Sequence, residues 1–188
     1  FGAADPEYMG DFSDPLASIT SSINNFAAYF DDLTADRKAN PTDDLATVIA
    51  NGEVDGELIG DRERLWYYII VATAGHDTTS FAFSGGMEQL LRSPDQLQAL
   101  RDDPTLTSNA AEEMIRWTSP VRSFFRWAQE DIEIGGTRIA AGDVVLTSYP
   151  SANRYDEVFN DPNRFDITRP DASKLLAFGL GVHYCLGS

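Results

Sequence analysis

One long segment constrains the fold of this chain more than any other feature. From about Asp61 to Leu91 the sequence predicts a single helix, which at about 1.5 Å per residue would be on the order of 45 Å long and would cross a whole domain. Apolar side chains between Leu65 and Val71 occupy every face of this helix, so we expect its middle to be buried. The sequence therefore favours a mainly α fold organised around one central helix.

The same helix carries an unusual polar stretch, Ala74-Gly75-His76-Asp77-Thr78-Thr79. Hydroxyl, imidazole and carboxylate groups inside a buried helix cost free energy unless they are hydrogen-bonded. Such a conflict between local sequence and burial is typical of a functional site. We therefore take this stretch as a candidate site.

Shorter helices are expected on both sides of the central one. Apolar residues recur at helical spacing from Asp14 to Arg37, and a short helix should follow Thr42 and stop at Asn51-Gly52. Ser93-Pro94-Asp95-Gln96 has the pattern of a capping box, with Pro94 as the first helical residue. A last helix is predicted from about Thr107 to Trp117.

A small β part is predicted after Pro120. The expected strands run over Phe124 to Ala128, Ile132 to Ile134 and Val144 to Thr147, with a turn at Gly135-Gly136. An ordered meander from Asp156 to Lys174 leads to a glycine-rich end. We expect one partial domain, helical over 1–118, with a small β region over 119–150 and the meander and a cysteine loop over 151–188.

Composition excludes several classes of protein. The formal net charge is -16, without the basic face that a nucleic-acid-binding protein normally shows. The single cysteine rules out a disulfide within the chain and favours a reducing, cytoplasmic location. No run of 18 apolar residues is present, so we expect no membrane span. The chain starts at Phe1 rather than Met and stops at Gly187-Ser188, where a helix should begin, and we interpret both ends as truncations.

The strongest motif is the segment from Phe178 to Gly187, which fits the pattern Phe-Gly-x-Gly-x-His-x-Cys-x-Gly. Six fixed residues would coincide by chance on the order of once in 10^7 to 10^8 positions, at roughly one in twenty per residue. Glycines let the backbone turn tightly and approach a flat cofactor. A cysteine just before a helix N-terminus lies among free N–H groups that stabilise its thiolate. A buried structural cysteine and a zinc site are the alternatives, but zinc wants about four ligands, and the chain has one cysteine and two histidines.

With these residues the sequence resembles the cytochrome P450 family, whose haem iron is ligated by the thiolate of such a loop, here Cys185. The resemblance implies a cytochrome P450 fold that is incomplete, without its N-terminal half and without the helix after Cys185. It also implies a haem b cofactor (iron protoporphyrin IX), with Phe178, Gly179 and Gly187 lining it. A thiolate opposite the open iron position favours O–O cleavage.

Three further groups of residues match the family. Glu113 and Arg116 fit the Glu-x-x-Arg of its K helix and, with Arg164 from the meander, would form a structural charge cluster. An i,i+3 pair of this kind is by itself ordinary helix-surface chemistry. Arg126 and His183 match residues that bind the haem propionates, as cations do with buried carboxylates.

The polar stretch of the central helix matches the oxygen-activating segment of the family. By resemblance, Thr78 would hydrogen-bond dioxygen or an adjacent water, and Asp77 would relay protons from solvent. A threonine bonded back to its own helix is the alternative for Thr78. His76 is interpreted as structural. Three residues lie one or two turns before Thr78 on one face of the helix and would line the substrate pocket, namely Ile70, Thr73 and Ala74.

The resemblance implies a haem-thiolate monooxygenase that inserts one oxygen atom of dioxygen into a C–H bond of a small apolar substrate, with ferredoxin and ferredoxin reductase as electron donors. It is nearest to soluble bacterial members that hydroxylate terpene alcohols such as α-terpineol and linalool, on segments that include Ser148-Tyr149-Pro150-Ser151-Ala152-Asn153-Arg154. Tyr155 departs from the family, which usually has an acid there. A peroxygenase or dehydratase and a haem sensor are the rival functions, and the Asp77-Thr78 pair argues against both. We expect the fragment itself to be inactive.

Overall fold

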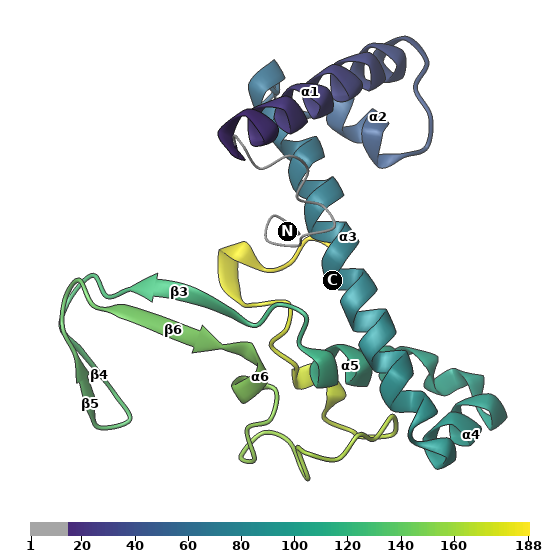
Figure 1. The fold of residues 1–188 in the computed structure, drawn as a ribbon, viewed down its shortest axis with the longest axis vertical. Coiled ribbons are helices and arrows are strands. Elements are labelled where there is room, and N and C mark those ends of the chain that lie inside the picture. The colour runs from purple at the N-terminus through teal and green to yellow at the C-terminus, as the bar shows by residue number, and fades with distance from the viewer. Residues whose placement is uncertain (1–14) are drawn as a thin grey trace. The chain divides into compact units, whose positions relative to one another are not determined.

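The computed structural model describes residues 15–188, with the side chains of residues 20–188. The expected domain begins at Phe1, where a truncation is also expected, and residues 1–14 lie outside the described range. The fold is mainly α with a small β part, as predicted (Figure 1). Two compact units divide the chain at Asp77 and Thr78, and α3 (Asp61–Leu91) contributes to both.

The first unit holds two helices, a hairpin and the start of α3. Its other elements are α1 (Pro15–Ala39), α2 (Leu45–Ala50), β1 (Glu53–Val54) and β2 (Glu57–Leu58). Phe30 of α1 stacks on Tyr68 of α3 with ring centroids 4.7 Å apart, and the Tyr68 hydroxyl donates to the Ala46 carbonyl at 2.9 Å. The cap of α2 is Asp44, whose side chain accepts from the Thr47 N–H at 2.7 Å. The two-residue strands were not predicted from the sequence.

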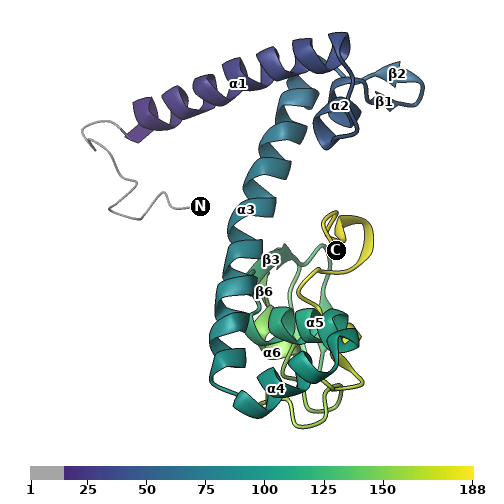
Figure 2. The same cartoon turned by 90° about the vertical axis from the view of Figure 1, so that its right-hand side faces the viewer.

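The second unit packs the end of α3 against two helices. These are α4 (Pro94–Asp102) and α5 (Thr107–Thr118), joined by the 3-10 helix η1 (Pro104–Leu106). Its core joins the helices to the meander through Leu90, Ala110, Phe165 and Ile167. Figure 2 shows α4 and α5 beside the end of α3. A Cβ on Gly86 would lie 2.5 Å from the Cβ of Met114, so glycine is what lets α3 approach α5.

The β part consists of two antiparallel pairs in the second unit. Its strands are β3 (Ser123–Trp127), β4 (Ile132–Ile134), β5 (Thr137–Ile139) and β6 (Val144–Ser148). β3 pairs with β6, with Arg126 opposite Val145, and β4 pairs with β5. Three short helical turns follow, α6 (Tyr149–Ala152), η2 (Ala172–Lys174) and η3 (Gly181–His183).

The capping box that the sequence predicts at the start of α4 is wrong in detail. Ser93 makes no side-chain capping bond to α4, although Pro94 is the first helical residue as predicted. Gln96, the other half of the expected capping box, is buried and accepts instead from the Ile167 N–H at 2.9 Å. A long-range contact with the meander therefore replaces the local one.

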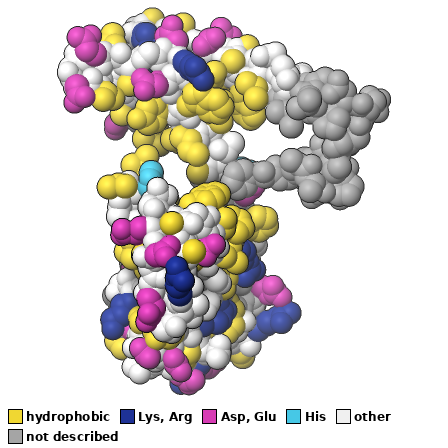
Figure 3. Space-filling view, turned by 90° about the vertical axis from the view of Figure 1, so that its left-hand side faces the viewer, with side chains coloured by type: hydrophobic (Ala, Val, Ile, Leu, Met, Phe, Trp, Pro, Cys, Tyr) yellow, Lys and Arg dark blue, Asp and Glu magenta, His cyan; other side chains and the backbone are white. Residues whose placement is uncertain are grey.

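The expected burial of the middle of α3 is also wrong for this chain. Tyr68 is buried, but Trp66, Tyr67 and Ile70 are 53%, 46% and 58% exposed. Hydrophobic side chains are visible at the surface of each unit (Figure 3). An all-round apolar helix needs cover on every side, and the described residues cover only part of it. No helix among these residues is long and apolar enough to cross a membrane.

Candidate functional site

The cysteine loop is a tight turn built on glycines. Gly179 and Gly181 have φ values of +75° and +76°, a left-handed region that side chains other than glycine rarely adopt. The Cys185 N–H donates to the Phe178 carbonyl at 2.9 Å, which closes the loop between the two ends of the motif. Phe178 packs on Tyr184 with ring centroids 6.3 Å apart. This geometry presents the Cys185 thiol at the surface.

Apolar residues close to Cys185 along the chain are also exposed. Leu180, Val182 and Leu186 are 73%, 97% and 90% exposed. Exposed apolar side chains of this kind are typical of a surface that binds another group. The loop is therefore suited to hold an apolar group with one atom that a thiolate can ligate.

A buried charge cluster lies in the same unit as this loop. Glu113 and Arg116 are fully buried, and the carboxylate accepts from Arg116 Nε at 2.6 Å and from its Nη2 at 2.9 Å. Arg169 brings a second guanidinium, with its Nε 2.9 Å from Glu113 Oε2. Buried charges persist only when paired in this way.

The expected third member of the cluster, Arg164, is wrong. Its side chain is 60% exposed and reaches only Asp166, at 3.9 Å. The backbone explains the difference, because the Arg164 carbonyl accepts from Arg169 Nη2 at 2.8 Å and from Arg116 Nη2 at 3.3 Å. Arg164 thus supplies a carbonyl to the cluster, while Arg169 supplies the charge.

The protonation of this cluster follows from its pairing. Burial lowers the pKa of Arg169, but Glu113 and Asp171 raise it more, so the net pKa is above its ordinary value. Burial raises the pKa of Asp171, whereas the Asn160 N–H and Arg169 lower it, and the net pKa is below its ordinary value. Both groups are therefore charged at neutral pH.

Asn153 connects the cluster to the cysteine loop. Its carbonyl accepts from Arg116 Nη1 at 2.7 Å, and its amide donates to the Ser119 hydroxyl at 2.9 Å. Its side-chain oxygen accepts from the Leu176 N–H at 2.7 Å, two residues before Phe178. No role was predicted for Asn153 or Arg169 from the sequence. Asn153 lies in the segment from Ser148 to Arg154 that resembles the family, and this is a signal that could have indicated it.

In the polar stretch of α3, the side chains of His76 and Asp77 are in contact. His76 Nδ1 lies 2.7 Å from Asp77 Oδ1, with His76 78% exposed and Asp77 29% exposed. Among the expected pocket residues, Ile70 and Ala74 are exposed, and Thr73 donates its hydroxyl to the Ile69 carbonyl at 2.7 Å. Thr78 is half-buried in the same helix.

Arg126 and His183, the two residues expected to bind the propionates, both have exposed side chains. Arg126 on β3 donates to the Phe125 carbonyl at 2.9 Å and lies over the Phe124 ring at 5.9 Å. His183 lies in η3, two residues before Cys185. In the part of the chain that the structure describes, no hydrogen bond or ion pair joins Arg126 to His183.

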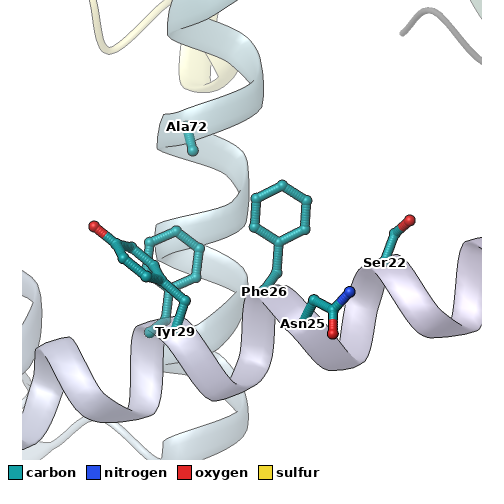
Figure 4. Close-up of a pocket in the computed structure, with 6 residues that line it drawn as sticks. Ser22, Asn25, Phe26, Tyr29 and Ala72 are labelled. Carbon is teal, nitrogen blue, oxygen red and sulfur yellow. The ribbon is translucent and has the colours of Figure 1, made fainter. Parts of the chain in front are cut away.

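An open apolar groove of about 650 Å³ lies between α1 and α3 within the first unit (Figure 4). Phe26, Tyr29 and Phe30 supply its aromatic wall, and Ala72 supplies the α3 side. The groove does not include Ile70, Thr73 or Ala74, the residues expected to line a pocket.

Comparison with known proteins decides the family. The family model described as Cytochrome P450 matches residues 17–188. The chain belongs to the cytochrome P450 family. In structure it is similar to CYP108D1 from Novosphingobium aromaticivorans, with a TM-score of 0.83, 47% identity, and coverage of 91% of this chain and 41% of that one.

Three curated P450 relatives illustrate the range of similar proteins. Cytochrome P450-terp from Pseudomonas sp is 46% identical over 88% of this chain and 39% of its own length. Steroid C26-monooxygenase from Mycobacterium tuberculosis is 41% identical over 94% of this chain and 51% of its own. Linalool 8-monooxygenase from Pseudomonas putida is 38% identical over 100% of this chain and 45% of its own. The chain thus spans about half the length of these P450 relatives or less.

The cysteine loop fits the haem that the P450 family implies. It combines an exposed thiol, exposed apolar neighbours and two left-handed glycines, and a Cβ on Gly187 would lie 3.9 Å from Cys185 Sγ. A flat apolar group with one ligating atom needs this combination of donor and surface.

Proposed function

We propose that the protein of which this chain is part is a haem-thiolate monooxygenase, and that Cys185 supplies the thiolate. The observation that carries this proposal is the geometry of the cysteine loop, in which glycines present the thiol at an exposed apolar surface. Membership of the P450 family supports it, because the family implies a haem.

The proposed cofactor is haem b, held by this loop and by two side chains. Cys185 would ligate the iron, Phe178, Gly179 and Gly187 would pack against the ring, and Arg126 and His183 would bind the propionates. Their exposure leaves both side chains able to reach carboxylates. When bound, the haem supplies an iron centre at which dioxygen, two electrons and two protons yield a hydroxylated substrate and water.

The residues of α3 would manage protons and substrate. Thr78 would hold a hydrogen bond next to the reacting oxygen, and the Asp77 carboxylate would pass protons inward from solvent. Ile70, Thr73 and Ala74 would contact the substrate. The Thr73 hydroxyl donates to the Ile69 carbonyl, so Thr73 would present its methyl group to an apolar ligand.

The proposed substrate is a small apolar molecule, specifically a terpenoid. Linalool 8-monooxygenase among the relatives supports this class. A steroid is the second candidate, supported by the steroid C26-monooxygenases. A ferredoxin with its reductase is the proposed electron donor, and the cytoplasm the proposed location, as the resemblance to bacterial members implies.

The thiolate is tested by Cys185→Ser in the full-length protein. We expect the mutant to lose the carbon monoxide difference spectrum that reports thiolate ligation, because serine does not replace a thiolate at iron. Ser173→Ala, an exposed change in the same terminal region, should keep the wild-type spectrum. An unchanged thiolate spectrum in Cys185→Ser would rule out the assigned ligand.

A further inference from the structure

His76 and Asp77 make a contact that the proposed function does not use. The two side chains are successive on α3, yet His76 Nδ1 lies 2.7 Å from Asp77 Oδ1. Successive side chains on an α-helix diverge by about 100° and do not normally face each other. Both side chains must therefore turn toward a common side of the helix to make this contact.

The exposure of the two side chains is unequal. The imidazole is 78% exposed, whereas the carboxylate is 29% exposed. His76 is thus the more exposed partner, and its Nδ1 contacts one of the two Asp77 oxygens. A group that bonds to one oxygen of a half-buried carboxylate can fix the orientation of that carboxylate.

We propose that His76 is a positioning residue for Asp77, and that its Nδ1–H donates to Asp77 Oδ1. The proposal rests on the proposed role of Asp77 in passing protons inward. A carboxylate has two acceptor oxygens, so Oδ1 accepts from His76 while Oδ2 takes part in proton transfer. Without this donor the carboxylate would rotate freely into solvent, and protons would reach the site more slowly.

The contact requires a particular arrangement of protons on the ring. A neutral imidazole carries its proton on one nitrogen only, and the hydrogen bond that each nitrogen makes decides which. Donation to Asp77 places the proton on Nδ1 and leaves Nε2 to face water. This arrangement gives the proposal a readout that does not depend on turnover.

The functional test is a pair of variants in the full-length holoenzyme. His76→Phe keeps a ring but removes the donor, and His76→Asn places an amide N–H near the position of Nδ1. The turnover rate should fall on the order of tenfold in His76→Phe, the effect of losing one hydrogen bond to a charged group. His76→Asn should restore most of it. Glu88→Gln, which removes an exposed ion pair with Arg92 on the same helix, should leave it unchanged.

The spectroscopic test uses the nitrogen-15 signals of the His76 ring in the same protein, assigned by their loss in His76→Phe. We expect a protonated Nδ1 in the wild type and a shift of the proton to Nε2 in Asp77→Ala, which removes the acceptor. An unprotonated Nδ1 in the wild type would overturn the proposal, as would a wild-type turnover rate in His76→Phe or equal damage in both His76 variants. If Asp77→Asn leaves the turnover rate unchanged, the proposed role of Asp77 fails, while the ring signals still test the contact itself.

Discussion

At the scale of single residues, the charge that completes the buried cluster comes from Arg169. The resemblance to the family indicated Arg164, because that arginine lies in the stretch of the meander that matches it. The chain turns between the two positions, where the Arg169 N–H donates to the Asp166 carbonyl at 3.2 Å, and the Arg169 side chain beyond this turn is buried against Glu113. Spacing along a loop without regular structure does not report which side chain points inward, so this assignment required coordinates.

Arg169→Leu should therefore be far more damaging than Arg164→Leu. Removing Arg169 leaves the fully buried Glu113 with one partner fewer, and breaking a buried pair costs about 3–5 kcal/mol. The exposed Arg164 keeps its carbonyl when its side chain is shortened, so its loss should cost at most about 0.5 kcal/mol. Urea unfolding of the two variants measures the difference. Equal destabilisation would contradict the assignment of Arg169.

Thr78→Ala and Asp77→Asn should affect different quantities. Without the Thr78 hydroxyl, electrons should be lost as peroxide while substrate binding stays near the wild-type level. Without the Asp77 acid, turnover should slow by roughly 10^2-fold, the lower end of the effect of a proton-transfer group. Peroxide, product and reducing equivalents consumed are measured together. Unchanged coupling in Thr78→Ala would exclude the proposed role of this hydroxyl.

At the scale of elements, the long helices and the strands β3, β4 and β6 could be predicted with close bounds, whereas β5 was not predicted. The predicted and observed bounds of α3 agree, because a strongly apolar run of that length leaves few alternatives. The β1–β2 hairpin was missed, since strands of two residues have no period to detect. The capping box failed because Gln96 makes a contact 71 residues away along the chain, which no local pattern encodes.

Gly86→Ala should separate α3 from α5. An added Cβ would lie 2.5 Å from the Cβ of Met114, closer than carbon atoms can approach, and this part of Met114 cannot swing aside. Overpacking of this kind costs about 1–3 kcal/mol. Ser84→Ala, an exposed change two residues earlier, should alter stability by less than about 0.5 kcal/mol. Thermal unfolding of both variants measures the effect, and a wild-type melting temperature for Gly86→Ala would show that the helices do not pack in this way.

The link between α1 and α2 should weaken in acid. The pKa of Asp44 lies well below its ordinary value of 3.8. The largest cause is the hydrogen bond from the Thr47 N–H, and the second is the hydrogen bond from Arg37 Nε, 2.8 Å from Asp44 Oδ2. A carboxyl whose folded pKa is lowered stabilises the fold fully above its unfolded pKa, and this contribution is lost as the pH falls through the folded pKa. Asp44→Asn keeps a capping side chain but removes the charge. The wild type should be more stable than Asp44→Asn at neutral pH, and the difference should shrink below about pH 4. Arg37→Gln should remove part of the same difference, and a constant difference down to pH 2 would contradict the charge pairing.

At the scale of the whole molecule, the sequence indicated the family and the mainly α fold but not the exposure of the apolar residues. Burial of the α3 middle was expected from its composition, yet Trp66, Ile70 and Phe81 are 53%, 58% and 63% exposed. Helical periodicity records which faces need cover and does not say which part of the protein supplies it. The chain spans 39–51% of the length of its curated relatives, so cover from outside the described residues is consistent with the pattern.

Residues 1–188 expressed alone should bind haem weakly and should not hydroxylate substrate. The apolar side chains around Cys185, with Val182 97% and Leu186 90% exposed, would stay in contact with water, and so would those along α3. Exposed apolar surface of this extent favours aggregation or a loosely packed state over a cooperative fold.

The measurements that check this are haem per chain, the cooperativity of thermal unfolding, and product formed with a competent reductase system. We expect substoichiometric haem, a broad transition and no product, and the full-length protein should give one haem and a cooperative transition under the same conditions. The comparison separates the loop from its surroundings, because both proteins contain Cys185, Arg126 and His183. One tightly held haem, a cooperative melt and product from residues 1–188 would mean that these residues bury their apolar surface without help, and the reasoning from exposure would be wrong.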